Sequence, residues 1–324
     1  MRTITMSHVA EVDATGAFQR QENAFATPFG SGAGDLPVAA NRYRLLWAPV
    51  CPWAHRAVIV RRLLGLESVI SLGTLDPLRP TDVPRVDWAF TLDKGGVDPV
   101  LGIRYLSEAY LKADPAYQGR PTVPALVDLS SGKVVYNDYH ELTYELERKW
   151  KPYHGAGAPD LLPVDLEADI RALSRKIFTQ LNNGVYRGGF AESQSAYEEA
   201  YDDVFSMLDE LEMRLAHSRY LFGSHLTDAD IRLYVTLARF DAAYHTAFRM
   251  NRNRLIDFPN LWAYARDLYQ TPGFGDTTDF LAIKQHYFTS ITIDEENSGF
   301  RVLPKGPDLS GWQQPSGRDH QVYI

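Results

Sequence analysis

A strand-like apolar run leads straight into the only cysteine of this 324-residue chain. Residues 43–50 (Tyr-Arg-Leu-Leu-Trp-Ala-Pro-Val) have the length and composition of a buried strand, and residues 57–65 fit an amphipathic helix closed by glycine. Pro52 suits the first position of a helix, because its missing N–H would have no partner there. The sequence therefore predicts that Cys51 occupies the N-cap of a helix that directly follows a strand.

A cysteine at that position is chemically distinctive. Its sulfur lies beside free backbone N–H groups and the positive end of the helix dipole, which stabilise a thiolate, the reactive form of cysteine. The alternative is a small buried core residue, because free cysteine is among the most buried residue types. We favour a nucleophile, since Pro52 fixes the place of Cys51 relative to the helix start.

Composition narrows the class of protein. The net charge is −8, with 33 basic and 41 acidic residues, and no basic block stands out, so nothing favours nucleic acid or an anionic membrane as a partner. No apolar run approaches the roughly 18 residues of a membrane span, and the N-terminus lacks a signal-peptide pattern. A single cysteine cannot form an internal disulfide, so we expect a cytoplasmic protein whose redox chemistry needs an external thiol. The nine histidines lack metal-ligand spacing, and no metal is expected.

The order of elements indicates two domains. Residues 1–40 have weak periodicity and predict an extended arm. Residues 41–150 predict a small α/β domain, with strands at 43–48, 69–74, 122–128 and 133–137, helices after Cys51 and at 138–150, and an irregular insertion at 75–118. A breaker-rich linker (151–164) leads to an all-helical domain (165–290) and a polar tail (291–324). Within the helical part, Thr227 and Asp230 predict a helix-capping box, which we favour over an acid in a site.

Pro124 follows Val123 at the start of a predicted strand, where a proline cannot donate to the sheet. Either the Val123–Pro124 bond is cis, which turns the Val123 backbone toward a ligand, or Pro124 lies in an edge strand. The triplet alone does not choose between them. A cysteine at a helix start, followed about 70 residues later by Thr-Val-Pro, resembles the thioredoxin-like half of glutathione transferases, and the all-helical second half agrees with that resemblance.

The resemblance narrows to one class. Residues 51–56 (Cys-Pro-Trp-Ala-His-Arg) closely match the signature of glutathionyl-hydroquinone reductases, the Xi-class transferases. Further segments that resemble the same family are 16–20, 87–90, 114–124, 182–191, 239–241, 258–262 and 283–287. The matches outside the arm span about residues 41–290, and it is the set that is specific rather than any one segment besides the cysteine motif.

The resemblance implies a reaction. Cys51 attacks the thioether sulfur of a thiol–hydroquinone conjugate, the hydroquinone leaves, and a second low-molecular-weight thiol resolves the mixed disulfide on Cys51. Polarising the ring hydroxyls and protonating the leaving carbon suit phenol side chains, so the resemblance gives catalytic roles to Tyr186 and Tyr287 and places Tyr244 in the aromatic substrate pocket. Ordinary amphipathic packing is the alternative for these tyrosines, since the chain has 18.

The family also implies residues that bind the thiol. Trp88 would stack on the thiol, and Val123 and Pro124 would pair with its cysteinyl backbone. The partners are then a small-molecule thiol and a quinone conjugate, and a homodimer is common in the family. Arg56 lies five residues after Cys51 and is expected to point away from it, toward solvent or the edge of the core.

The chain departs from the family in one segment. Where the family has Asn-Glu-Ser-Ser, which holds the γ-glutamyl end of glutathione, this chain has Asn137, Asp138, Tyr139 and His140. Asp138 replaces the acid with a shorter reach, and the bulk of Tyr139 fills part of the subsite, although Asn137 or Asp138 also suits a helix N-cap. The co-substrate is therefore glutathione or another thiol, such as mycothiol.

Two other functions stay open. One is a general thioltransferase, or deglutathionylase, that acts on mixed disulfides with the same nucleophile. The other is a non-catalytic transferase-like module that binds ligands or partner proteins, against which the intact cysteine motif argues. The rate of Cys51 alkylation against pH separates the enzymes from the module.

Overall fold

Two compact units make up the computed structural model, which describes residues 11–81, 83, 86–290 and 302–318. The sheet unit comprises the described residues of 21–158 together with 289–290. The helical unit comprises residues 11–20, 159–288 and 302–318. The N-terminal arm thus contributes to both units, and the predicted domain limits stay predictions. No helix in the described ranges is both long enough and apolar enough to cross a membrane.

The sheet unit is built on four strands in the order β2-β1-β3-β4. The strands are β1 (Tyr43–Trp47), β2 (Ile70–Thr74), β3 (Ala125–Asp128) and β4 (Lys133–Tyr136). β1 pairs in parallel with β2 and antiparallel with β3, and β3 and β4 form a hairpin. Every residue of β1 is buried, as expected for an apolar central strand.

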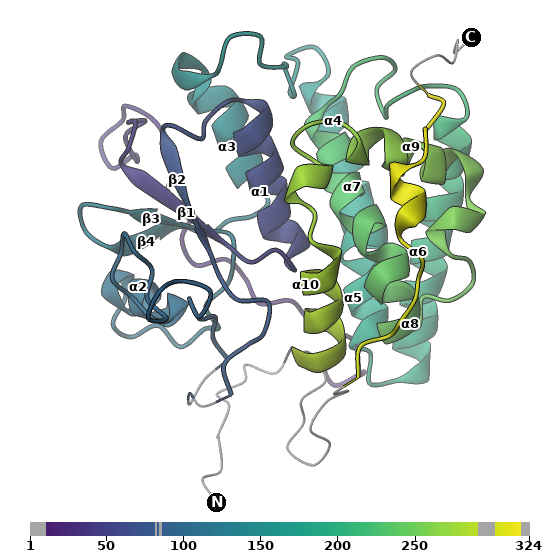
Figure 1. Ribbon diagram of the computed structural model, residues 1–324, viewed down its shortest axis with the longest axis horizontal. Helices are drawn as coiled ribbons and strands as arrows, with labels where there is room; N and C mark the ends of the chain where they lie inside the picture. Colours follow the sequence, from purple (N-terminus) through teal and green to yellow (C-terminus); the bar gives the residue numbers. More distant parts are fainter. Residues whose placement is uncertain (1–10, 82, 84–85, 291–301, 319–324) are drawn as a thin grey trace, which may run out of the picture. The chain divides into compact units, whose positions relative to one another are not determined.

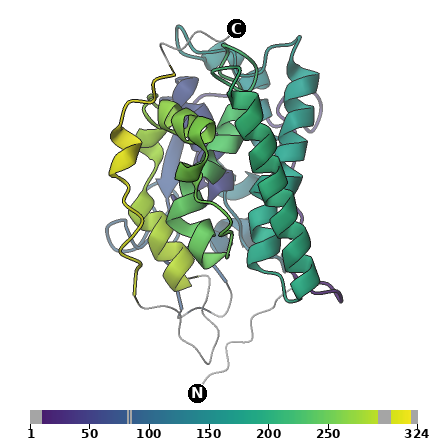
Figure 2. The ribbon, with the colours of Figure 1, turned by 90° about the vertical axis from the view of Figure 1, so that its right-hand side faces the viewer.

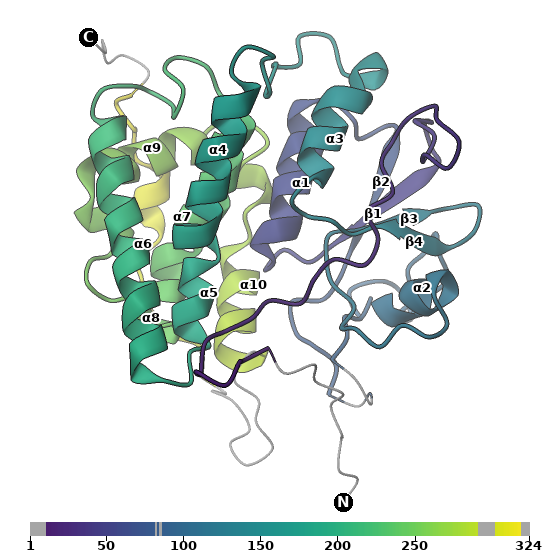
Figure 3. The ribbon, with the colours of Figure 1, turned by 180° about the vertical axis from the view of Figure 1, so that it is seen from behind.

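Three helices flank this sheet. α1 (Pro52–Leu63) and α3 (Leu142–Lys149) pack together on one face, whereas α2 (Leu106–Ala113) lies on the opposite face (Figures 1 and 3). The short helix η1 (Lys151–Tyr153) follows α3. Because β1 runs directly into α1, residue 51 is carried at the end of the sheet by two buried elements.

α2 corrects the prediction that residues 75–118 are irregular throughout. The helix has only eight residues, and its start is set by Glu108, whose Oε1 accepts the N–H groups of Arg104 and Tyr105 at 2.7 and 2.9 Å. Because the helix is short and is flanked by glycine, proline and aspartate, its periodicity was too weak to predict it from the sequence.

The helical unit contains no strand among its described residues, only isolated bridges. Its elements are α4 (Glu167–Ile177), η2 (Phe178–Asn182), α5 (Gly184–Gly189), α6 (Gln194–Leu215), α7 (Asp228–Arg239), η3 (Phe240–Tyr244), α8 (His245–Ala247), η4 (Leu255–Asp257), α9 (Pro259–Tyr269), η5 (Gly275–Thr277), α10 (Phe280–Gln285), η6 (His286–Ser290) and η7 (Ser310–Gln313). The long α6 packs against η2 and α5, and it runs beside the column that η2 and α5 form (Figure 2).

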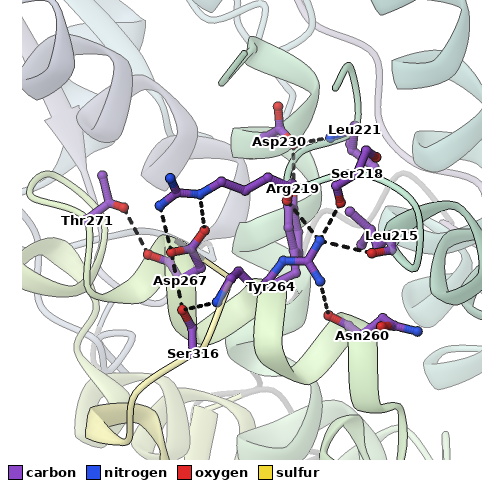
Figure 4. A network of polar contacts seen from close by, with 11 residues as sticks. Leu215, Ser218, Arg219, Leu221, Asp230, Asn260, Tyr264, Asp267, Thr271 and Ser316 are labelled. Carbon is purple, nitrogen blue, oxygen red and sulfur yellow. Dashed lines mark hydrogen bonds and ion pairs between the residues drawn. The ribbon is translucent and has the colours of Figure 1, made fainter. Parts of the chain in front are cut away.

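A buried carboxylate organises the start of α7. Asp230 is fully buried and accepts the Leu221 N–H at 2.9 Å and the Tyr264 hydroxyl at 2.8 Å (Figure 4). It also accepts the Thr227 N–H at 2.8 Å. Its side chain completes a capping box with Thr227, so the structural role predicted for these two residues is confirmed. Burial raises the pKa of Asp230, although the hydrogen bonds that it accepts oppose the shift.

The C-terminal segment is tied into the same network. Arg219 forms a two-pronged ion pair with Asp267, at 2.9 and 3.0 Å (Figure 4). Arg318 is 2% exposed, and its Nη2 donates to the carbonyls of Leu215 and Ser218 at 3.0 and 2.5 Å. The described part of the tail is therefore held against α6 and α9 by buried charge-assisted hydrogen bonds.

Candidate active site

Cys51 occupies the N-cap of α1, as the sequence predicts. Its backbone is extended (φ −79°, ψ 116°), Pro52 is the first helical residue, and the His55 N–H donates to the Cys51 carbonyl at 3.0 Å. The Cys51 side chain is half-buried rather than sealed in the core. The thiol Sγ lies 3.3 Å from the Val123 carbonyl oxygen, which accepts its hydrogen bond. The sulfur thus belongs to a half-buried residue at the positive end of a helix, which favours the thiolate.

The Val123–Pro124 peptide bond is cis, which decides between the two readings of that dipeptide. Pro124 precedes β3, which begins at Ala125, so the proline is not an edge-strand residue. Val123 is 4% exposed, and its carbonyl faces the Cys51 sulfur. The cysteine motif and the Thr-Val-Pro segment, which first suggested the family resemblance, thus meet at one point.

Two residues of the cysteine motif, Trp53 and Arg56, stack together with Tyr139. The Arg56 guanidinium lies 4.6 Å from the centroid of the Trp53 ring, and Trp53 stacks on Tyr139 with centroids 5.2 Å apart and planes at 27°. Arg56 is fully buried, so the expectation that it points to solvent or the core edge is wrong. Trp53 precedes Arg56 by three residues and presents its ring on the same side of α1, where a cation gains from the π face.

The segment that departs from the family is held by the arm. Asp138 Oδ1 accepts Asn23 Nδ2 and the His140 N–H, both at 2.9 Å. The buried Asn137 side chain accepts backbone N–H groups from residues 24 and 25. Neither residue caps α3, because that helix begins at Leu142 with Glu141 at its N-cap; the capping role expected for them is wrong. Asn23 was not predicted, because it lies in a segment of weak periodicity.

Trp88 is 3% exposed. The Arg79 guanidinium lies 4.0 Å from its ring centroid and also donates to the Asp87 carbonyl at 3.1 Å. Arg79 is a contact that sequence reasoning missed. The predicted stacking of Trp88 on a thiol stays a prediction, as do the thiol-binding roles of Val123, Pro124, Asp138 and Tyr139.

In the helical unit, three tyrosine hydroxyls meet. The Tyr186 and Tyr287 oxygens are 2.5 Å apart, and Tyr244 lies 3.3 Å from each. The three residues come from α5, η3 and η6, and none is more than 7% exposed. The structure thus brings together all three tyrosines selected from the sequence. We call them the tyrosine cluster; their catalytic roles stay a prediction.

Apolar rings surround the cluster and make it a low-dielectric site. Phe248 stacks on Tyr244 at 5.4 Å and meets Tyr186 and Tyr287 edge-on at 5.3 and 5.5 Å. Burial raises the pKa of Tyr287 well above its usual value, and Tyr186 and Tyr244 add to the shift while Arg239 opposes it. A phenol in such surroundings keeps its proton and acts as a hydrogen-bond donor.

The arm supplies two residues next to the cluster. The Arg20 guanidinium lies 4.7 Å from the Tyr186 ring centroid and 5.2 Å from that of Phe18. Its Nε donates to Asn183 Oδ1 at 2.8 Å. Residues 16–20 resemble the family, but no role was predicted for Arg20. The only indication in the sequence was a Phe and an Arg within a segment of weak periodicity.

Chemically, the described residues offer a thiol, phenols and aromatic surfaces. In those ranges, no group of three or more His, Cys, Asp or Glu side chains is arranged to hold a metal. The helix-start thiol is suited to nucleophilic attack and the phenols to proton donation.

Comparison with known proteins agrees with this chemistry. The glutathione S-transferase N-terminal and C-terminal domain models match residues 50–149 and 194–267. Glutathionyl-hydroquinone reductase YqjG of Escherichia coli K12 is 39% identical over 94% of this chain and 93% of its own length. A glutathione transferase structure from Gordonia bronchialis is 53% identical, with a TM-score of 0.82 over 88% of this chain and 86% of that one. The glutathione-S-transferase Xi of Phanerochaete chrysosporium is 34% identical, with a TM-score of 0.86 over 96% and 99% of the two chains.

These matches confirm the predicted fold class, a thioredoxin-like N-terminal domain followed by an all-helical C-terminal domain. They cover both units, and the curated relative spans nearly the whole chain. The chain belongs to the glutathione transferase family and, within it, is an enzyme of the glutathionyl-hydroquinone reductase, or Xi, class.

Proposed function

We propose that the protein reduces thiol–hydroquinone conjugates with Cys51 as its nucleophile. The observation that carries the proposal is the position of Cys51, a half-buried residue at the N-cap of α1 whose sulfur lies 3.3 Å from the Val123 carbonyl. The names of the curated relatives in Escherichia coli and Sphingobium chlorophenolicum, both glutathionyl-hydroquinone reductases, support this substrate class.

The reaction has two displacements at sulfur. In the first, the Cys51 thiolate attacks the thioether sulfur, an S–S bond forms, and the carbon–sulfur bond breaks with its electron pair going to the ring carbon. That carbon takes a proton and leaves as part of the free hydroquinone. In the second, another thiolate attacks the mixed disulfide, releases the oxidised thiol and restores Cys51. The conjugate is reduced, and two thiol equivalents are oxidised to one disulfide.

The tyrosine cluster takes the aromatic part of the conjugate in this proposal. Tyr186 and Tyr287 donate protons or hydrogen bonds to the ring, and Tyr244 lines the aromatic pocket. Three phenol hydroxyls within 3.3 Å of one another, in surroundings that hold the Tyr287 proton, support these roles.

The names of the curated relatives favour glutathione as the thiol co-substrate, whereas residues 137–140 of this chain favour a different thiol. Tyr139 stands where the family has a serine, and its ring stacks on Trp53 of the cysteine motif, which leaves less room for a γ-glutamyl group. Trp88, Val123, Pro124 and Asp138 would bind the rest of the thiol. A hydroxyl-rich thiol such as mycothiol would stack on and hydrogen-bond to Tyr139 and His140.

A thiol panel tests this choice. Turnover of one hydroquinone conjugate is measured with glutathione, mycothiol and a simple monothiol. A kcat/KM at least about tenfold higher with mycothiol, or about 1.4 kcal/mol, supports the altered subsite. A clear preference for glutathione removes mycothiol from the proposal and leaves the Cys51 chemistry intact.

The competing function is a general thioltransferase on mixed disulfides, which needs the same Cys51 but a less demanding aromatic pocket. Replacing Tyr186 and Tyr287 with Phe separates the two. Loss of conjugate turnover with disulfide reduction retained supports the hydroquinone reductase, and equal retention of both supports the thioltransferase. A Cys51→Ser variant that keeps either activity would show that Cys51 is not the nucleophile, and absence of both activities in the wild type would support the binding module.

The setting of the enzyme is proposed on the same family basis. We expect a homodimer, because dimers are common in the family. We also expect a cytoplasmic location, which agrees with the single cysteine. Light scattering of the purified protein measures the oligomeric state, and fractionation of the native host measures the compartment.

A further inference from the structure

The arm is built into the helical unit rather than laid over it. The Gly16 carbonyl accepts the Glu192 N–H at 2.9 Å, and Phe18 is 7% exposed, with its ring 5.3 Å from that of Phe190. Gly16 has φ +80°, and a Cβ there would lie 2.8 Å from the Ser193 backbone nitrogen. Only glycine fits this close approach, so the path of the arm is fixed two residues before Phe18.

Arg20 ends this arm segment and reaches the helix that carries Tyr186. Its Nε donates at 2.8 Å to Asn183 Oδ1, and Asn183 is the N-cap of α5. This hydrogen bond sets the guanidinium 4.7 Å from the centroid of the Tyr186 ring. The cation is thus held over one particular member of the tyrosine cluster by a residue of the same helix.

The three hydroxyls of the cluster lie within hydrogen-bond distance of one another, and in each pair either oxygen can donate. Burial is the main reason that the pKa of Tyr287 is raised, so Tyr287 keeps its proton and can donate it to the Tyr186 oxygen 2.5 Å away. In that arrangement the Tyr186 oxygen receives a hydrogen bond that stabilises negative charge on it. Its own proton is the one left to point elsewhere, toward Tyr244 at 3.3 Å or toward a bound ligand.

Other charged and titratable groups surround Tyr186. From the neighbouring elements these are Arg20 of the arm, Tyr244 of η3, Tyr287 and His286 of η6, Arg239 at the end of α7, and Arg249, which donates to the Gly188 and Gly189 carbonyls of α5. Among these groups, Arg20 is the cation whose guanidinium lies over the Tyr186 ring itself.

We propose that Arg20 is a positioning residue that makes Tyr186 the proton donor of the tyrosine cluster. A cation over the ring face is attracted to the π electrons, and this attraction grows when the phenol becomes a phenolate. Arg20 therefore favours the state in which Tyr186 has given up its proton. This inference rests on the proposed function, and it makes Tyr186 the source of the proton that the ring carbon takes when the carbon–sulfur bond breaks.

The step balances in protons and electrons. As the carbon–sulfur bond breaks, the ring carbon keeps the electron pair and takes the Tyr186 proton, and Tyr186 becomes a phenolate under Arg20 with a hydrogen bond from Tyr287. The second thiol must lose a proton before it attacks the mixed disulfide. That proton restores the Tyr186 phenol, so the cycle ends with the protein unchanged.

Arg20→Met and Arg20→Lys test the proposal, with Arg252→Met as a matched control. Arg252 also lies over an aromatic ring in the helical unit, 4.5 Å from the Phe205 centroid, but it is exposed to solvent and pairs with Asp209 rather than with a tyrosine of the cluster. Protein labelled with 13C at tyrosine Cζ is titrated by NMR without substrate, and the Tyr186 signal is identified by its loss in Tyr186→Phe. Conjugate turnover and reduction of a simple disulfide are measured on each variant.

We expect the titration midpoint of Tyr186 to rise in the order wild type, Arg20→Lys, Arg20→Met. We also expect kcat for the conjugate to fall about tenfold in Arg20→Met, with KM changed less and disulfide reduction retained. Arg252→Met should match the wild type in all three measurements.

Two results would overturn the proposal. One is an unchanged Tyr186 titration midpoint in Arg20→Met, and the other is equal midpoints in Arg20→Met and Arg20→Lys. Either result would mean that Arg20 only anchors the arm. Because the titration needs no substrate, it decides the role of Arg20 even if wild-type protein fails to turn over hydroquinone conjugates, the result that would defeat the proposed function.

Discussion

The rings of Trp53 and Tyr139 stack at 5.2 Å, so the segment in which this chain departs from its family rests directly on the cysteine motif. The Arg56 guanidinium also lies over the Trp53 ring, 4.6 Å from its centroid. A substitution at residue 139 therefore changes the packing of Trp53, two residues after Cys51. Under the proposed function, it should alter thiol selectivity without altering the nucleophile.

Tyr139→Ser should shift selectivity toward glutathione. The substitution restores the residue type of the family and removes the ring that occupies the subsite, so we expect the ratio of kcat/KM for glutathione to that for mycothiol to rise about tenfold. Tyr153→Phe, which changes a tyrosine of the sheet unit on η1, serves as the control. An unchanged ratio would show that Tyr139 does not select the thiol.

Cys51 should react as a thiolate below the pH at which an ordinary thiol ionises, near 8.5. Cys51 is the N-cap residue of α1, and the positive end of a helix favours an anionic sulfur at that position. Alkylation by iodoacetamide, followed by mass spectrometry from pH 5 to 10, measures the midpoint, and Cys51→Ser gives the background. A rate that rises only above pH 8.5 would contradict activation by the helix.

Tyr287→Phe should flatten the loss of stability at alkaline pH. The folded-state pKa of Tyr287 lies well above the ordinary value of 10.0, mainly because of burial. Above pH 10 the unfolded chain therefore releases a proton that the folded chain keeps, and this group lowers the free energy of unfolding as pH rises. The contribution is fully present below pH 10 and falls by about 1.4 kcal/mol per pH unit above it.

Urea unfolding of the wild type, Tyr287→Phe and the control Tyr201→Phe, at several pH values above 10, measures these slopes. Tyr201 lies on α6 outside the cluster. Parallel slopes for the wild type and Tyr287→Phe would mean that Tyr287 ionises in the folded protein.

Asp230→Ala should destabilise the protein by about 3 kcal/mol or more. The variant leaves the Leu221 and Thr227 N–H groups and the Tyr264 hydroxyl without their buried acceptor. Asp308→Ala, at an exposed carboxylate of the tail, is the control. The free energy of unfolding from urea titration reports both, and a loss below about 1 kcal/mol would show that water replaces the carboxylate.

Local signals in the sequence predicted much of this structure. Pro52 marked the start of α1 and so the position of Cys51, and Thr227 with Asp230 marked the start of α7. In each case the residues that interact are at most a few positions apart. The three tyrosines were found differently, through family resemblance, since nothing local signals that residues 186, 244 and 287 meet.

The contacts that were missed join distant parts of the chain. Arg20 bonds to Asn183 across 163 positions and Asn23 to Asp138 across 115, and no periodicity within the arm predicts such partners. Arg56 was misjudged because a charged residue one turn past Cys51 was expected near solvent, whereas the face of Trp53 allows it to be buried.

The anchoring of residues 16–20 has a practical consequence for anyone preparing this enzyme. A protein trimmed at residue 21 would keep Cys51 and all three tyrosines, and would pass a check of its catalytic side chains, yet it would lack the Phe18 ring and the Arg20 cation beside Tyr186. How much N-terminal sequence is retained is therefore a variable of the assay, and tags are better placed at the other end of the chain.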